Sequence, residues 1–124
     1  MYQILLFLAA HHFLSLFTQT FFLHRYAAHQ VFTMSKFWEK VFFVCNWAFQ
    51  GSSYLSPSTY GRMHRLHHAY ADTENDVHSP KHDKTIWNMM VKTKKNYTGI
   101  HEGDIVLEDK FLGNLPEWGW FDKF

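Results

Sequence analysis

The sequence of 124 residues contains one cysteine, three prolines and almost no excess of charge. The single Cys45 excludes an internal disulfide and any zinc cluster built on cysteine. The formal net charge of +1 gives no general attraction to nucleic acid, which is therefore not an expected partner. Motifs of several enzyme classes are also missing. There is no nucleophile elbow, no glycine-rich phosphate loop and no His-Glu-x-x-His zinc motif.

Charged side chains are absent from residues 1–23, and the first one is Arg25. As a helix this stretch would measure about 34 Å, enough for a hydrocarbon core of about 30 Å. It lacks the basic start and small-residue cleavage site of a signal peptide. We therefore predict a transmembrane helix. His11 and His12 lie inside it, and His11 is about 19 Å from His24 along a helix axis, so we expect them to pack against protein or to support a ligand.

Three histidines, His64, His67 and His68, follow one another at positions i, i+3 and i+4. On an α-helix these side chains fall within an arc of about 100°, so their nitrogens face one direction. Imidazole nitrogens on one face can bind a single iron, zinc, copper or nickel ion. The triplet is therefore the leading candidate for a metal site.

A second pair, His24 and His29, lies at the end of the predicted span with a spacing of i, i+5. On an α-helix their rings would point about 140° apart, so they are not expected to share a face. They could bind a metal only with partners from elsewhere in the chain, and the triplet around His64 is the obvious source.

Whether the two groups can meet depends on residues 37–56, a second apolar stretch. If it crossed the bilayer, the two groups would lie about 30 Å apart on opposite sides. If residues 37–56 lie in the membrane interface or form a re-entrant segment, the two histidine groups lie on the same side of the membrane. The nearby basic residues then lie on that side as well. Those residues are Arg25, Lys36, Lys40, Arg62 and Arg65. We predict the interfacial arrangement, with the histidines on the cytoplasmic side and the amino terminus outside.

An acidic segment follows the triplet and contains Asp72, Glu74 and Asp76. Each carboxylate could hold a ligand imidazole by accepting its other ring proton, or could simply lie in a solvated loop. His78 is separated from the next histidine by a proline, which argues against a regular helix there. We expect His78 to support the site without binding the metal itself.

The remaining residues predict an amphipathic helix over 84–98, either at a membrane surface or against a missing partner. Residues 102–117 are expected to form an exposed loop with glycine and proline turns. The chain then becomes apolar where no later element follows to cover the side chains, which suggests an interrupted domain. These side chains are Trp118, Trp120, Phe121 and Phe124.

The paired motifs resemble a known family. His24-Arg25-x-x-x-His29 and His64-Arg65-x-His67-His68 resemble the first and second histidine boxes of the integral-membrane fatty-acid desaturases, nearest to the acyl-CoA type. Nearly the whole chain takes part, because three further segments also look like that family. These are Asp76-Val77-His78-Ser79-Pro80, Ala48-Phe49-Gln50 and Asn114-Leu115-Pro116.

The resemblance implies a centre of two iron ions that uses O₂ and two electrons from a cytochrome b5 or ferredoxin-type donor. Such a centre removes hydrogens from neighbouring methylenes of a fatty acyl-CoA or acyl-lipid and leaves a cis double bond. The implied iron ligands are His24, His29, His64, His67 and His68. Weaker implied contacts to substrate or acyl carrier are Arg62, Trp47 and Gln50, although Met63 stands where some members carry an acid.

The third histidine box of the family and its membrane helices are not in this sequence, and five histidines cannot fill two iron shells of about six positions each. We therefore expect an all-α membrane protein with an incomplete desaturase fold, an amino-terminal fragment that is inactive alone. Its predicted parts are 1–23 (span), 24–36 (first box), 37–56 (interfacial helix) and 57–124 (second box and cytosolic segment). A hydroxylase of the same superfamily and a non-enzymatic metal-binding membrane protein are the alternatives.

Overall fold

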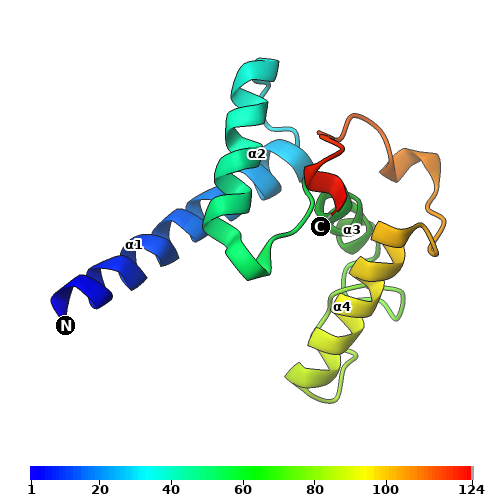
Figure 1. The fold of residues 1–124 in the computed structure, drawn as a ribbon. Helices are drawn as coiled ribbons and strands as arrows, with labels where there is room; N and C mark the ends of the chain where they lie inside the picture. The colour runs from blue at the N-terminus through cyan, green and yellow to red at the C-terminus, as the bar shows by residue number, and fades with distance from the viewer. Residues whose placement is uncertain (124) are drawn as a thin grey trace.

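The computed structural model describes residues 1–123 and contains helices but no strand over that range (Figure 1). The predicted all-helical class is therefore confirmed. In chain order the longer elements are α1 (Tyr2–Thr18), the π-helix η1 (Gln19–Ala28), α2 (Lys36–Gln50), α3 (Pro57–Tyr70) and α4 (Ile86–Glu102). Three short 3₁₀ helices complete them: η2 (Gly51–Ser53), η3 (Asp109–Phe111) and η4 (Phe121–Lys123).

Helices α1 and η1 form one continuous rod, Tyr2–Ala28, which is long and apolar enough to cross a membrane. Its 27 residues exceed the predicted length of the span. Thr18 is the only buried residue of α1, which otherwise projects away from the rest of the molecule (Figure 1). His11 and His12 are exposed on this projecting part, where His11 stacks on Phe7 at 6.0 Å and His12 lies edge-on to Phe13 at 5.8 Å, both within the same helix.

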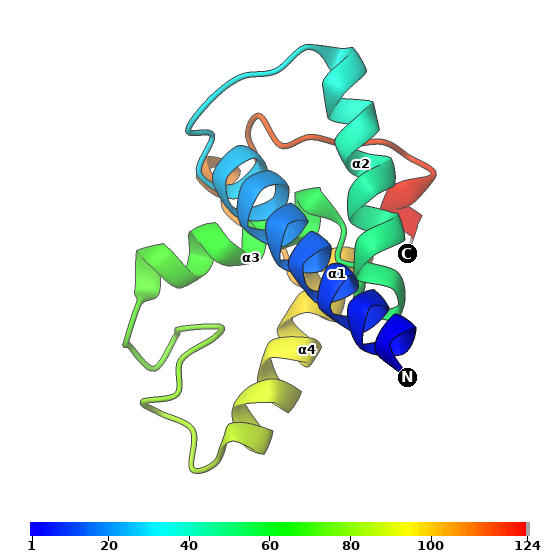
Figure 2. The ribbon, with the colours of Figure 1, turned by 90° about the vertical axis from the view of Figure 1, so that its left-hand side faces the viewer.

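Helix α2 packs against the rod (Figure 2), and three of its buried residues are polar: Glu39, Asn46 and Gln50. Glu39 is buried, where it accepts hydrogen bonds from the Tyr26 hydroxyl and from the Lys36 ammonium group at 2.8 Å. Large apolar side chains face outward instead, namely Phe37, Trp38, Val44 and Trp47. With 15 residues, α2 measures about 22 Å and is too short for a core of about 30 Å. Among the described residues the rod Tyr2–Ala28 is the one candidate span, and the interfacial placement of α2 stays a prediction.

Two apolar clusters hold the helices together. The first joins η1, α2 and the carboxyl-terminal residues through Phe22, Leu23, Phe43 and Phe121. The second joins α3, α4 and η3 through the side chains of Met63, Leu66, Ile100 and Phe111. η1 contributes to the first cluster and α3 to the second, and Tyr60 of α3 also packs against the first.

The sequence-based expectations for the end of the chain were wrong in two places. Phe121 is buried and Trp118 packs beside it, because η1 and α2, from much earlier in the chain, cover them. Phe124 lies outside the described residues. The segment 102–117 is not a wholly exposed loop, since Phe111 of η3 inserts beneath α3 and α4.

Gly61 lies where α3 approaches both η1 and Leu115. A Cβ atom at this position would lie 2.5 Å from Leu115 Cδ2 and 3.4 Å from the Ala27 carbonyl oxygen. A larger residue would therefore displace the Leu115 side chain, while its Cβ atom would lie at contact distance from the backbone of η1. One turn later, the Arg65 guanidinium donates hydrogen bonds to the carbonyl oxygens of Ala28 at 3.2 Å and Gly113 at 2.7 Å. These contacts fix the end of η1 relative to α3.

Candidate metal centre

His24 and His29 share one face of η1, which corrects the α-helical expectation for this pair. Their ring centroids are 4.5 Å apart. The reason is the π-helical backbone: the His29 amide donates to the His24 carbonyl oxygen at 3.0 Å, an i to i+5 hydrogen bond. In a π-helix residues i and i+5 are the neighbours that i and i+4 are in an α-helix. The predicted separation of about 140° applies only to α-helical geometry.

The triplet lies on α3, as the spacing predicted, and two of its rings are close. The centroids of His64 and His68 are 4.6 Å apart, and those of His64 and His67 are 6.2 Å apart. α3 begins with Pro57 in its first turn, where a missing amide hydrogen costs nothing. The helix then carries the triplet in its last two turns, beside the end of η1.

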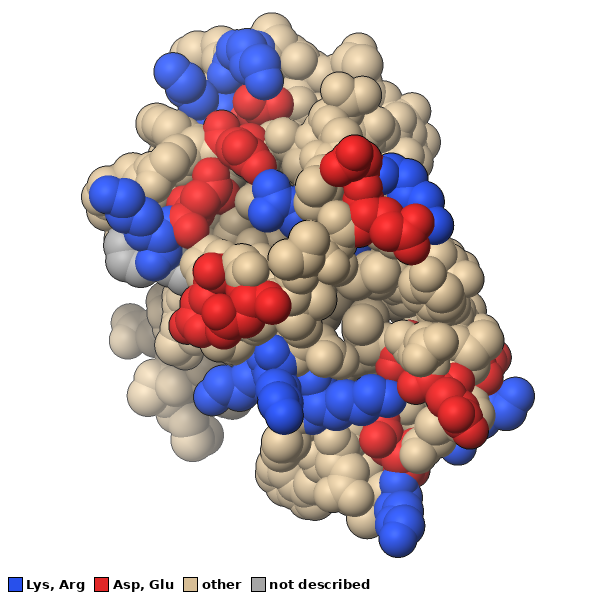
Figure 3. All heavy atoms as spheres, turned by 90° about the vertical axis from the view of Figure 1, so that its right-hand side faces the viewer, with Lys and Arg blue, Asp and Glu red and all other residues tan. Residues whose placement is uncertain are grey.

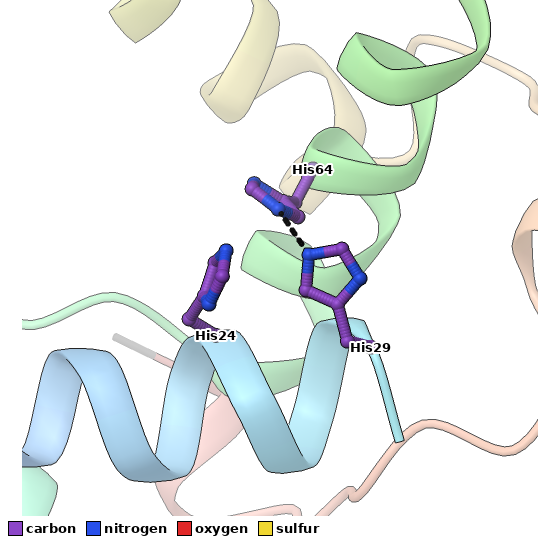
Figure 4. Close-up of side chains that lie close together, drawn as sticks. All are labelled: His24, His29 and His64. Carbon is purple, nitrogen blue, oxygen red and sulfur yellow. Dashed lines mark hydrogen bonds between the residues drawn. The ribbon is translucent and has the colours of Figure 1, made fainter. Parts of the chain in front are cut away.

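The two helices bring their histidines together (Figure 4). Nitrogen atoms of His24, His29 and His64 all lie within 4.8 Å of one another. His64 is at the centre of the cluster: its Nε2 is 3.0 Å from Nε2 of His29 and 3.0 Å from Nε2 of His68. A group of three histidines that could hold a metal ion is therefore present, drawn from segments 35 residues apart.

Hydrogen bonding alone accounts poorly for this convergence. A neutral imidazole nitrogen either carries one proton or offers one lone pair, so Nε2 of His64 cannot form two good bonds to two other Nε2 atoms. A metal ion accepts a lone pair from each nitrogen. Two nitrogens bound at about 2.1 Å in neighbouring octahedral positions lie about 3.0 Å apart, and tetrahedral positions would separate them by about 3.4 Å. The spacing around His64 is compatible with nitrogens bound to one ion, but 3.0 Å is also an ordinary N–H···N distance and does not select the ion's geometry.

Electrostatics keep the cluster ready for a cation. Burial, followed by the neighbouring rings of His24, His68, His29 and His67, lowers the pKa of His64 to about 3. Burial also lowers the pKa of His29, together with His24, His68 and Arg65. Both imidazoles are therefore neutral near pH 7, which is the form that binds a metal.

His67 is oriented by a buried carboxylate. Its Nδ1 lies 2.8 Å from Oδ1 of Asp76, which also accepts the amide hydrogen of His78 at 2.9 Å. Burial alone would raise the pKa of Asp76, but the hydrogen bonds from His67 and from the amides of His78 and Asp72 hold it below its usual range. Asp76 thus stays charged, and Nε2 of His67 is left free to face the cluster.

The other predicted supports lie further from the cluster. Asp72 is engaged by its own loop, where its carboxylate accepts a hydrogen bond from Ser79 at 3.3 Å. Glu74 is exposed and makes no hydrogen bond or ion pair within residues 1–123. His78 reaches across to α4, with Nδ1 at 2.8 Å from the Thr93 hydroxyl, and its ring centroid is 6.0 Å from that of His67.

A partly apolar hollow adjoins the cluster. It measures about 330 Å³ and is lined by His64, His67 and His78 together with Leu55, Tyr60, Met63, Gln19 and Thr93. A second hollow of about 270 Å³, between α3 and α4, shares four of these lining residues and extends to Met90. Sequence reasoning missed Tyr60, whose ring stacks on His64 at 5.5 Å. Its position one turn before His64 was the available signal.

The residues implied as substrate or carrier contacts lie elsewhere. Gln50 is buried between α1 and α2, where its amide donates to the Ser15 carbonyl oxygen at 3.0 Å. Trp47 stacks edge-on against Trp120 and Phe121 near the end of α2. Arg62 lines a separate polar hollow of about 300 Å³ and pairs with Glu117 at 2.7 Å.

Comparison with known proteins adds no further assignment: no family model, no curated protein and no solved structure matches this chain.

Proposed function

We propose that this chain supplies part of the iron centre of a membrane enzyme that desaturates fatty acyl chains. The observation that carries the proposal is the convergence of His24 and His29 with His64 and His68 from two separate helices. The order and spacing of these residues are those of the two histidine boxes that the sequence resembles. A structural histidine pair would not require four rings around one point.

The donor set fits iron. Imidazole nitrogens bind ferrous and ferric iron, and the 3.0 Å separations around His64 are compatible with nitrogens bound to one ion. Five histidines are too few for two six-coordinate ions, so the proposal requires ligands from further protein segments or from water. Bound there, two irons would supply the oxidation of a methylene pair by O₂. The residues of this chain would position the substrate, shield it from water and orient the metal-binding imidazoles.

The surroundings favour an apolar substrate. The two hollows share the apolar lining residues Leu55 and Met63; one is also lined by Met90, and the other by His64 and His67. An acyl chain placed there would lie along apolar walls with one segment near the metal, and the hollow would exclude water from it. Arg62, in the neighbouring polar hollow, is the candidate contact for the acyl carrier.

Asp76 has a defined task in this proposal. Its charge holds the Nδ1 proton of His67 and thereby presents Nε2 as the metal-binding atom. Tyr60 stacks on His64 and restricts the rotation of that ring. The other proposed participants are O₂ and a cytochrome b5 or ferredoxin-type electron donor. Placement of the cluster on the cytoplasmic side of the membrane belongs to the same proposal.

Iron titration of the purified chain tests the metal site. The chain in detergent, loaded with ferrous iron without oxygen, is expected to hold iron at fewer than two ions per molecule. The double variant His29→Ala/His64→Ala is expected to hold none, and the matched control His11→Ala/His12→Ala is expected to bind as the unaltered chain does. Equal binding by all three proteins would contradict the site.

A second measurement separates the enzyme from a simple metal-binding protein. With cobalt in the site as a visible probe, a saturated acyl-CoA of 16 or 18 carbons is expected to shift the cobalt absorption spectrum, and free coenzyme A is not. The reason is that only the acyl chain would enter the hollow beside His64. A spectrum unaltered by either compound would favour the non-enzymatic alternative.

A further inference from the structure

The amino-terminal half of α4 exposes large apolar side chains that nothing in residues 1–123 covers. Trp87 is 74% exposed and Val91 is 67% exposed, and Ile86 is exposed beside them. The helix packs through Ile100 and Tyr97 onto Met63 and Leu66 of α3, and Met90 lines the hollow between α3 and α4 together with Tyr97. The three side chains Ile86, Trp87 and Val91 are called the α4 apolar face.

Basic side chains predominate along this helix. Residues 84–101 contain no aspartate or glutamate and four lysines, namely Lys84, Lys92, Lys94 and Lys95. Glu102 and Asp104 lie nearby, where they line a hollow with Val91, Lys94 and Lys95. An apolar surface with an excess of lysines around it is complementary to the headgroups of anionic lipids. The face of the molecule turned away from the amino-terminal end of α1 carries acidic and basic side chains intermixed (Figure 3).

The orientation of α4 relative to α1 fits contact with the same bilayer. α1 projects from one side of the molecule, and α4 slopes so that its amino-terminal end lies closer to that side than its carboxyl-terminal end does (Figures 1 and 2). With the rod Tyr2–Ala28 across a membrane, the α4 apolar face would approach the surface of that membrane. A lysine side chain can lay its methylenes on apolar surface while its charge reaches the headgroups.

We propose that the amino-terminal half of α4 is an in-plane anchor that inserts the α4 apolar face into the headgroup region of an anionic lipid bilayer. Trp87 is its deepest side chain, and Lys92, Lys94 and Lys95 bind lipid phosphates beside it. Thr85, whose hydroxyl accepts the amide hydrogen of Asn88 at 3.1 Å, starts the helix at the membrane surface. The anchor requires α1 in the bilayer, but it does not depend on the metal site or on the proposed enzyme.

Lipid contact is measured with a fluorophore at single positions of the full chain. In a Cys45→Ser background, cysteine is introduced at position 87 or 91 and labelled, and the protein is placed in nanodiscs that contain brominated phosphatidylglycerol. Position 106 serves as the matched control, because Val106 is apolar and 91% exposed but lies outside α4. Bromine quenching is expected to be at least twofold greater at 87 and 91 than at 106, and to fall in nanodiscs of neutral lipid.

Two results would overturn the anchor. One is bromine quenching at 87 and 91 no stronger than at 106. The other is protection of position 87 from both brominated lipid and aqueous acrylamide, which would mean that protein covers the face. The triple variant Lys92→Gln/Lys94→Gln/Lys95→Gln tests the role of charge, and it is expected to reduce quenching at 87 while the helical circular dichroism stays unaltered. Undiminished quenching would remove lipid phosphate binding from the proposal.

Discussion

The two histidine-bearing helices reach the same cluster by different backbone geometries. In α3 the spacing of i, i+3 and i+4 matches the α-helical turn, and the rings of His64 and His68 lie 4.6 Å apart. In η1 the spacing of i, i+5 matches a π-helical turn, and the rings of His24 and His29 lie 4.5 Å apart. The rings are about equally close in both helices. Their proximity therefore depends on a sequence spacing that matches the helix type, and neither the spacing nor the helix type determines it alone.

The helices also differ in how their histidines are held. His67 is oriented by the buried carboxylate of Asp76, and His64 by the stacked ring of Tyr60. His29 is exposed at the end of η1, and its position depends on the hydrogen bonds that Arg65 makes to the end of that helix. The α3 side of the cluster is therefore supported by side chains, and the η1 side by its link to α3.

The largest effect is expected from removing the histidine that contacts both groups. His64→Ala should weaken metal binding by more than about 100-fold, because loss of an outer support alone costs about 10- to 100-fold. Isothermal titration with a divalent metal measures it. His101→Ala is the control, since His101 is bonded to Thr59 outside the cluster. If His29→Ala weakened binding more than His64→Ala, the central place of His64 would be wrong.

Arg65→Ala should break the link between the helices. The guanidinium bonds the carbonyl oxygens of Ala28, Phe111 and Gly113, and bonds to a charged donor contribute about 1.5–3 kcal/mol each before solvent exposure is considered. A loss of about 3 kcal/mol in the free energy of unfolding is expected, measured by denaturant titration in detergent. The exposed Arg25→Ala should cost less than about 0.5 kcal/mol, and equal losses would contradict the link.

Asp76→Asn is expected to affect the α3 side selectively. The amide cannot hold His67 through a charged acceptor, so metal affinity should fall by about 10- to 100-fold, or about 1.4–2.7 kcal/mol. The comparison variant Glu74→Gln changes an exposed carboxylate of the same loop and should leave affinity unaltered. Equal effects would show that the loop acts through its net charge and not through the bond to His67.

The smallest effect is a pH dependence of the metal-free chain. The pKa of His64 is lowered to about 3 in the folded state and lies near 6.5 in the unfolded chain. The unfolded chain therefore takes up the proton first, and stability falls as pH decreases from about 6.5 toward 3. Between about pH 6.5 and 5 only the upper part of this window is entered. Unfolding curves should show a shallower pH slope for His64→Ala, and an identical slope would contradict the assignment.

Some of this arrangement was accessible from the sequence because it follows from local geometry. The α3 triplet needs only α-helical spacing, and the rod that begins at Tyr2 needs only an uncharged apolar run. The burial of Phe121 was not accessible, since it depends on Phe22 and Phe43 from distant segments. Choosing Asp76 over its acidic neighbours requires the path of the loop, which the spacing of the acids does not determine.

The π-helix at the end of the rod has a consequence for how such a pair can vary. Removing one residue between His24 and His29 would leave an interval of i, i+4, which an ordinary α-helix serves equally well. Conversely, an α-helix can take up one residue added between such a pair by widening a single turn. That turn is then closed by an i to i+5 hydrogen bond, such as the one from His29 to His24. Intervals of four and five residues are thus interchangeable ways to aim two imidazoles at one point, provided that the turn changes with them.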